Sequence, residues 1–237
     1  MAMQPFGPAE KMQEAAGKLI QYFSEQGRPL VFTGLEKGFA DVLACYPAAS
    51  FTIESDRDNF DYVYLAEHLI SLSGRKLHSK KNHLNAFHKA NPQAQYLPIT
   101  ADIIPACRAE LESWYALRIQ DEPDDPFIGW ERKAIMEIFD DYSYFGLQGG
   151  AILLDGRIIA FTFGEQLNEN TAVVHVEEAD PNIRGAYPAI NQAYVSSCWQ
   201  DMMYINREED MGHDGLRKAK ESIVLAWRRA WGNSHES

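Results

Sequence analysis

Cysteines and long apolar runs are scarce in this chain of 237 residues. The three cysteines, Cys45, Cys107 and Cys198, are odd in number and far apart, which argues against a disulfide framework and fits a reducing compartment. No apolar stretch approaches the roughly 18 residues that a transmembrane helix needs. The N-terminus also lacks the basic segment followed by an apolar run that marks a signal peptide. We therefore expect a cytoplasmic protein without a membrane span.

Basic side chains are few as well. The 22 lysines and arginines stand against 34 acidic residues, so the formal net charge is −12. Averaged over the surface, this charge repels nucleic acid and anionic membranes, although a local basic patch can still bind a phosphate-bearing substrate. The sequence contains no P-loop, no Rossmann glycine fingerprint and no nucleophilic-serine elbow. A hydrophobic content of 46% is typical of a globular protein with one large or two small domains.

The stretch 171–222 carries the clearest functional pattern. An alternating run over 171–178 leads into a Pro/Asn/Gly turn at 180–185, an amphipathic helix over 186–199 and a short strand over 202–206. Strict alternation places Val174 and Val176 on one face of the first strand and His175 and Glu177 on the other. The last two would then lie at the carboxyl end of a strand, where α/β sheets bind ligands. The alternative is a half-buried histidine paired with a surface glutamate.

The rest of the chain reads as helices and strands in mixed order. We expect helices over 9–26, 36–45, 60–71, 76–90, 102–119 and 128–142, and strands over 29–33, 50–54, 95–99, 149–154 and 157–166. An Asp-Gly pair at 155–156 predicts a hairpin between the last two strands. This order predicts an α/β or α+β fold with mixed sheets flanked by helices.

The densest basic cluster of this acidic chain lies at the start of the helix over 76–90. Its members are Arg75, Lys76, Lys80 and Lys81. The functional interpretation is contact with a phosphate or another anion. The structural alternative is a solvated helix face with flexible lysines.

A metal site is not expected. His78, His83 and His88 are spaced by five residues, so each is rotated by about 140° from the last and the three cannot converge on one ion. Asp210 and Asp214 do not have the ligand spacing of an EF-hand loop.

Several runs resemble one protein family. They are HVEEADPNIRGAYPAIN from His175, YINREEDMG from Tyr204, GLRKAKES from Gly215, and the earlier DYVY, LSGRK and KKNHLNAF. Together they resemble the family of the phosphatidylglycerol lysyltransferase C-terminal domain. The resemblance implies a tandem GNAT-like acyltransferase fold, with an incomplete first unit over 1–93 and a second over 94–237. Lipid-modifying members of the family transfer an aminoacyl group from a charged tRNA to a lipid head group.

The strand pattern and the resemblance together imply a set of site residues. In the family, the segment corresponding to 206–220 looks like part of the substrate pocket. Its acidic residues would hold an amino group of the substrate, and its lysines would hold a phosphate group or stabilise the oxyanion. The alternative is a surface loop followed by a helical ion pair between Arg217 and Glu221. The expected residues are Glu177, Asp210 and Lys218 as catalytic groups; His175, Tyr187, Asn191, Asn206, Arg207, Glu208, Arg217 and Lys220 as substrate-binding groups; and Arg75, Lys76, Lys80 and Lys81 as tRNA- or anion-binding groups.

Acetyl-coenzyme A is a disfavoured donor. GNAT enzymes hold its pyrophosphate on a glycine-rich loop whose positions correspond here to Asn182, Gly185 and Tyr187, and only the glycine matches. We therefore expect no cofactor and an aminoacyl-tRNA or related aminoacyl donor, with an unknown acceptor. The alternatives are an acyl-coenzyme A N-acyltransferase and a non-catalytic protein that binds a small metabolite. The oligomeric state stays open.

Overall fold

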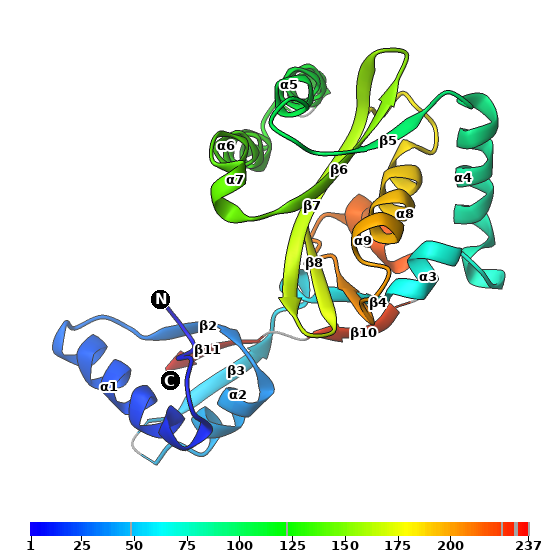
Figure 1. Ribbon diagram of the computed structural model, residues 1–237. Coiled ribbons are helices and arrows are strands. Elements are labelled where there is room, and N and C mark those ends of the chain that lie inside the picture. Colours follow the sequence, from blue (N-terminus) through cyan, green and yellow to red (C-terminus); the bar gives the residue numbers. More distant parts are fainter. Residues whose placement is uncertain (48, 122, 224, 230–231, 237) are drawn as a thin grey trace. The chain divides into compact units, whose positions relative to one another are not determined.

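The computed structural model describes residues 1–47, 49–121, 123–223, 225–229 and 232–236 (Figure 1). Contacts divide these residues into two compact units. Unit 1 comprises the described residues of Met1–Tyr62, Glu209–Lys220 and Trp227–Ser237, and unit 2 comprises those of Val63–Glu208 and Glu221–Ala226. The predicted boundary between GNAT-like units at residues 93 and 94 concerns a structural repeat, which a division by contacts does not test, and it stays a prediction.

The larger sheet belongs mainly to unit 2. In the described chain its strand order is β10-β4-β9-β8-β7-β6-β5. The strands are β4 (Asp61–Leu65), β5 (Gln95–Pro98), β6 (Gln148–Leu154), β7 (Arg157–Asn168), β8 (Thr171–Ala179), β9 (Tyr204–Asn206) and β10 (Leu225–Arg229). The pairs from β5 to β8 are antiparallel, as is β4 with β9, whereas β8 and β9 run parallel. A parallel pair requires a crossover connection, and here a helix supplies it.

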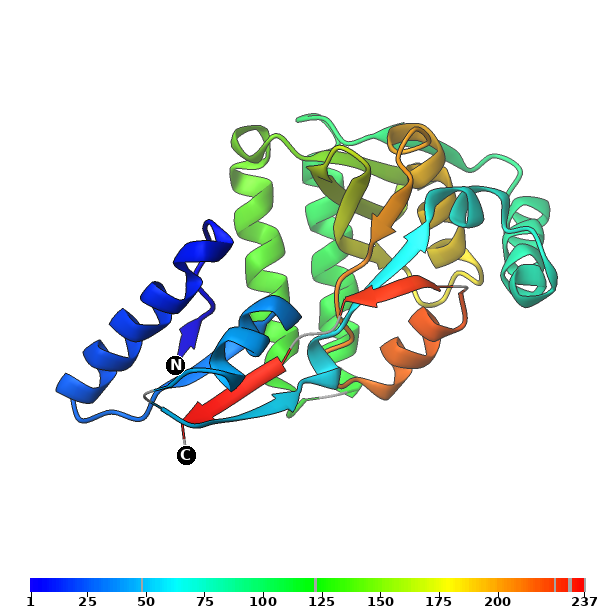
Figure 2. The ribbon, with the colours of Figure 1, turned by 90° about the horizontal axis from the view of Figure 1, so that it is seen from below.

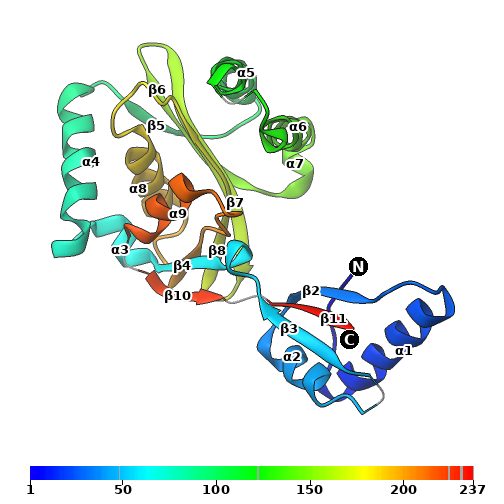
Figure 3. The same ribbon diagram turned by 180° about the vertical axis from the view of Figure 1, so that it is seen from behind.

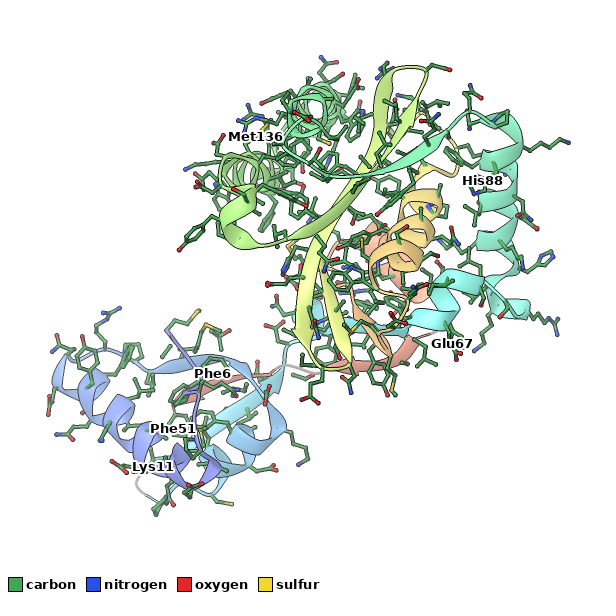
Figure 4. All side chains as sticks on the ribbon, in the orientation of Figure 1. Phe6, Lys11, Phe51, Glu67, His88 and Met136 are labelled. Atoms are coloured by element: carbon green, nitrogen blue, oxygen red, sulfur yellow. The ribbon has the colours of Figure 1, made fainter. Side chains whose placement is uncertain are left out.

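Helices cover both faces of this sheet (Figures 1 and 3). One layer is formed by α5 (Ile104–Asp121), α6 (Pro126–Asp140) and α7 (Tyr142–Phe145), and the other by α4 (His78–Ala90) and α8 (Ala186–Cys198). Trp114, Phe139 and Phe161 belong to the first core, and Met136, labelled in Figure 4, packs against it. Phe87 and Ile190 belong to the second. The short helices α3 (Ala66–Ser71) and η3 (Arg75–Leu77) precede α4.

Unit 1 contains a four-stranded sheet in the described residues, with the order β1-β2-β11-β3. Its elements are β1 (Ala2–Met3), η1 (Ala9–Lys11), α1 (Met12–Glu25), β2 (Val31–Leu35), α2 (Lys37–Ala44), β3 (Phe51–Ser55), η2 (Arg57–Asn59), α9 (Asp214–Glu221) and β11 (Gly232–Glu236). Strand β11 pairs antiparallel with both β2 and β3 (Figure 2). A C-terminal strand therefore completes a sheet that the N-terminal segment begins.

One predicted element is wrong over its first half. We expected a helix over 60–71, but β4 occupies Asp61–Leu65 and α3 begins only at Ala66. Tyr62, Val63 and Tyr64 are all buried, and β4 pairs with β9. A strand that is covered on both faces shows continuous burial without alternation, and a short apolar run of this kind resembles part of a helix in sequence.

Candidate functional site

Strand β8 extends beyond its parallel neighbour β9 at the carboxyl end. They pair only from Thr171 with Tyr204 to Val173 with Asn206. Strand β9 ends at Asn206, whereas β8 continues to Ala179. We call the region beside the unpaired second half of β8, in unit 2, the wedge, and α8 follows that half after a turn. The predicted order of strand, turn, helix and strand is confirmed here.

A β-bulge in β8 changes which side chains face the wedge. Phe163 of β7 is opposite Val176, and the next residue, Gly164, is opposite Val174. Val174 and Val176 therefore lie on opposite faces of the sheet, so the predicted strict alternation is wrong. A side chain at Gly164 would bring its Cβ to 1.9 Å from the Val173 carbonyl oxygen, so the bulge needs glycine at this position.

Glu177 lies at the centre of a buried polar cluster in the wedge. One carboxylate oxygen accepts a hydrogen bond of 2.7 Å from Nη2 of Arg207, and the other accepts one of 2.6 Å from Nδ2 of Asn191. The side chains of Arg207 and Glu177 are only 15% and 10% exposed, and the guanidinium lies 5.8 Å from the centre of the Tyr64 ring. Three residues that the sequence placed at the site, Glu177, Asn191 and Arg207, thus meet in one cluster.

Lys80 joins this cluster from α4. Burial lowers its pKa, the positive charge of Arg207 lowers it further, and the carboxylate of Glu177 acts in the opposite direction. A charge effect of this kind requires proximity. Arg75, Lys76 and Lys81 are exposed instead. The predicted basic cluster therefore has one member, Lys80, associated with the wedge, and three on the surface of unit 2.

Two shallow hollows adjoin the three exposed basic residues. One measures about 400 Å³ and is lined by Leu72, Ser73, Gly74, Arg75, His78 and Lys81. The other measures about 300 Å³ and is lined by Lys76, Glu221, Ser222, Ile223 and Leu225. Neither is lined by Glu177 or Arg207. In the wedge, by contrast, Asn191 and Arg207 bond directly to Glu177.

His175 has partners of its own. Its Nδ1 is 2.8 Å from Oε1 of Glu208 and its Nε2 is 3.2 Å from Oε1 of Glu165. The hydrogen bond to Glu208 is the largest influence and raises the histidine pKa, while burial opposes it. The side chain of Asn206 accepts the Glu208 N–H at 2.9 Å, which fixes the turn after β9. His175 and Glu177 thus form separate interactions, in contrast to the shared ligand position that alternation predicted.

Asp210 is the centre of a different cluster, which lies in unit 1. Its carboxylate is fully buried and accepts hydrogen bonds from Arg217 at 2.7 and 3.0 Å, Arg57 at 3.2 Å and Tyr62 at 2.5 Å. Burial alone would raise its pKa, but these bonds and the N–H of Gly212 outweigh it and lower the pKa well below the usual range. Such a carboxylate stays ionised and holds its neighbours in place.

The neighbours of Asp210 divide into buried and exposed groups. Arg217 also binds Asp58 at 2.6 Å. Lys220 is buried, donates to the carbonyl oxygen of Glu209 and lies 5.7 Å from the centre of the Tyr62 ring. Lys218 is exposed. These residues belong to unit 1 and Glu177 to unit 2, so their predicted common pocket stays a prediction.

The sequence interpretation missed a third cluster on the other face of β8. Glu178 is buried and lies near Tyr115 and Arg118 of α5 and Glu131 of α6. Tyr187 lies at the start of α8, and desolvation together with the nearby carboxylates of Glu178 and Glu177 raises its pKa. The available signal was that two adjacent glutamates follow an apolar strand, which places one of them toward each face.

The structure is a mixed α/β fold, with the ion pair of Glu177 and Arg207 beside the parallel strands β8 and β9. Residues 1–230 match the model of the family described as phosphatidylglycerol lysyltransferase, C-terminal, and the chain belongs to this family. The predicted family and fold class are thereby confirmed. The chain is also similar to a conserved protein of unknown function from Bacteroides thetaiotaomicron, with 34% identity, a TM-score of 0.88, and coverage of 100% of this chain and 79% of that one.

More distant relatives share the fold. L-PGS from Bacillus licheniformis is 11% identical with a TM-score of 0.65, over 98% of this chain and 76% of that chain. An uncharacterised protein of Mycoplasmoides gallisepticum is 26% identical over 165 residues, which are 68% of this chain, and the match spans about half (51%) of that relative. Among the residues that the structure describes, no helix has the length and apolar character needed to cross a membrane. The same residues contain no group of three or more His, Cys, Asp or Glu side chains that could hold a metal ion.

Proposed function

We propose that this protein is an aminoacyltransferase that takes an aminoacyl group from aminoacyl-tRNA or a related donor and passes it to an amine or hydroxyl acceptor. Membership of the family supports the reaction class. The observation that carries the proposal is the wedge between β8 and β9, where the ion pair of Glu177 and Arg207 lies close to half-buried Lys80. Buried charges are costly to the fold, and ionisable groups perturbed by burial and by a specific charged partner are candidates for a functional site.

The charges of the wedge suit the two polar ends of an aminoacyl ester. In this proposal a substrate ammonium group pairs with the Glu177 carboxylate by replacing one of the two donors, Asn191 or Arg207, that occupy its oxygens in the free protein. Lys80 and Arg207 offer positive charge to a carbonyl oxygen that becomes negative during acyl transfer, or to the terminal phosphate of the donor. Such groups accelerate transfer because they are already oriented and desolvated before the reaction begins.

The three exposed basic residues, Arg75, Lys76 and Lys81, suit the backbone of a charged tRNA. They lie immediately before or on α4, the helix that also carries Lys80. A nucleic acid held on this surface would have its phosphates near positive charge, although the protein as a whole carries a net charge of −12. The aminoacyl end would then approach the wedge along α4.

The acyl-coenzyme A alternative has less support from the turn before α8. The side chain of Asp180 accepts the N–H of Asn182 at 2.9 Å, and the N–H groups of Ile183 and Ala186 donate within the turn at 3.1 Å each. Donors that are already bonded are less available to a pyrophosphate, and the Asp180 carboxylate would repel one. We therefore keep the aminoacyl donor as the proposed substrate.

A donor screen tests the proposal. The full chain is mixed with tRNA charged with labelled amino acids, with acetyl-coenzyme A and with free amino acids, and both stabilisation by ligand and transfer to small amine acceptors are measured. We expect charged tRNA to act as donor and Glu177→Gln to slow transfer. Transfer from acetyl-coenzyme A alone would favour the acyltransferase alternative. Stabilisation by an amino acid without transfer from any donor would favour a metabolite-binding protein.

A further inference from the structure

His175 is the extra residue of the β8 bulge. Val174 is opposite Gly164 and Val176 is opposite Phe163, so His175 is inserted between two consecutive pairs of β7 and β8. A bulged residue departs from the regular alternation of a strand, and its side chain is directed toward groups that a pleated strand does not reach. The imidazole is 31% exposed. It lies between a side chain of β7 and a side chain of the turn that follows β9.

Both ring nitrogens of His175 face a carboxylate. Nδ1 is 2.8 Å from Oε1 of Glu208, and Nε2 is 3.2 Å from Oε1 of Glu165. An ionised carboxylate only accepts hydrogen bonds, and a neutral imidazole has a single N–H, so it donates to one of these groups but not to both. The imidazolium ion has two N–H groups and donates to both. The complete set of hydrogen bonds therefore requires the charged form of His175.

The charges around His175 favour the same form. The hydrogen bond to Glu208 is the largest influence and raises the histidine pKa, burial opposes it, and the charge of Glu208 and the interactions with Glu165 raise the pKa further. These two carboxylates, one on β7 and one after β9, are the charged groups that face the imidazole from the neighbouring strands. An opposite charge at this distance stabilises the imidazolium ion.

Glu208 belongs to a turn that begins where β9 ends. The last pairs of β9 join Asn206 to Val173 of β8 and to Val63 of β4, so Arg207 and Glu208 lie beyond the ladder of the sheet. The Asn206 side chain accepts the N–H of Glu208 at 2.9 Å, and Glu208 has a left-handed backbone with a φ of 53°. This conformation is unfavourable for a residue with a side chain, so surrounding contacts must hold it.

Arg207 lies between Asn206 and Glu208 in the chain, and its guanidinium donates to Glu177 at 2.7 Å. We propose that His175 is a positioning residue: as an imidazolium ion it holds Glu208 and thereby fixes the turn from which Arg207 reaches Glu177 in the wedge. All of these residues belong to unit 2. A neutral imidazole loses its charge and one of its two hydrogen bonds, so it holds the turn less firmly. The effect on acyl transfer rests on the proposed function.

Nitrogen-15 NMR of the full chain, labelled in histidine and arginine, tests the charge of His175 without any measurement of activity. The ring signals of His175 are identified by their absence in His175→Gln. We expect the pKa of His175 to lie above the ordinary histidine value of about 6.5, and Glu208→Gln to lower it because the closer negative charge is lost. A His175 pKa at or below the ordinary value would overturn the proposal.

The guanidinium of Arg207 gives a second readout in the same samples. Its rotation about the Nε–Cζ bond is slow while a carboxylate holds it. We expect this rotation to become faster in His175→Gln, and in the wild type as pH rises through the His175 titration. His88→Gln is the matched control, because His88 is an exposed histidine on α4 (Figure 4), and it should leave the rotation unchanged. Equal rotation rates of Arg207 in His175→Gln and the wild type would mean that His175 does not position it.

Transfer kinetics then show whether this positioning affects the reaction. We expect kcat to fall as pH rises through the His175 titration, and His175→Gln to remove that limb and to lower kcat about tenfold below it, with a smaller change in KM. A limb that persists unchanged in His175→Gln would contradict the role in transfer. If the wild type transfers from no charged tRNA, the proposed function fails, whereas the two NMR measurements still decide whether His175 holds the turn.

Discussion

Glu177 and Glu178 are neighbours in sequence but have opposite environments. Glu177 is neutralised by Arg207 and Asn191, two donors that converge on one carboxylate. Glu178 shares the hydroxyl of Tyr115 with another acid. The difference follows from the pleat of β8, which turns successive side chains to opposite faces. One strand thus directs one acidic side chain toward the wedge and another toward the layer of α5 and α6.

The pH dependence of the free energy of unfolding should show whether Glu178 is protonated in the folded protein. Between its ordinary pKa of 4.5 and the raised value of about 7, the folded chain holds a proton that the unfolded chain releases. Stability must therefore fall as pH rises through this window, by about 3 kcal/mol for a shift of this size. Glu178→Gln removes that fall, so its stability relative to the wild type should increase by this amount between pH 4.5 and pH 8.

Urea denaturation of both proteins across the pH range measures this difference, since other titrating groups affect both alike. Glu112→Gln serves as the control, because a hydrogen bond from Arg132 lowers the pKa of Glu112 instead of raising it. If the stability difference between Glu178→Gln and the wild type does not depend on pH, the protonated state of Glu178 is contradicted.

At the scale of elements, local patterns predicted most of the fold. The Asp-Gly turn between β6 and β7, the amphipathic helix now seen as α8 and the order of elements over 171–206 are all confirmed. The sequence-based prediction of elements failed where pairing with a strand distant in the chain determines the secondary structure. Strand β4 is buried on both sides and reads like a helix, and β11 lies in a stretch that we did not assign. The β8 bulge depends on the partner strand, which periodicity cannot show.

The predicted site residues divide in the same way. Glu177, Arg207 and Asn191 meet because strand ends and the following helix lie together, as the order of elements indicated. Lys80 reaches the same region from a helix about a hundred residues earlier in the chain, and only the fold reveals that. Glu178 and its partners come from three elements, so no local spacing could have identified them.

The bulge between β7 and β8 leads to a prediction about stability. Gly164→Ala should destabilise the protein by about 1–3 kcal/mol, because the added methyl group meets the Val173 carbonyl oxygen at 1.9 Å. Gly129→Ala in α6 is a matched control, since its Cβ would meet nothing within 4 Å and alanine is favoured in a helix by up to about 1 kcal/mol. Thermal denaturation compares them. Equal stability of the two variants would mean that the bulge does not depend on Gly164.

At the scale of the whole molecule, we expect an acidic protein with an exposed basic cluster at Arg75, Lys76 and Lys81 to bind tRNA with an affinity that depends strongly on salt. Replacing Arg75, Lys76 and Lys81 by alanine should weaken binding and reduce the slope of log affinity against log salt by about 2, because fewer counterions are released. Alanine at Lys18 and Lys37, exposed lysines of unit 1 that each pair with an acid, is the control. An unchanged slope in the triple variant would place the tRNA elsewhere.

The central claim is that the wedge between β8 and β9 is where transfer takes place, and Lys80 allows the most direct measurement. Single-turnover transfer from charged tRNA is compared for Lys80→Met and Lys89→Met, two lysines on α4 of which Lys89 is exposed. We predict that Lys80→Met lowers the rate at least about tenfold, which corresponds to about 1.4 kcal/mol of transition-state stabilisation, and that Lys89→Met leaves it unchanged. Equal rates for both variants and the wild type would contradict the claim.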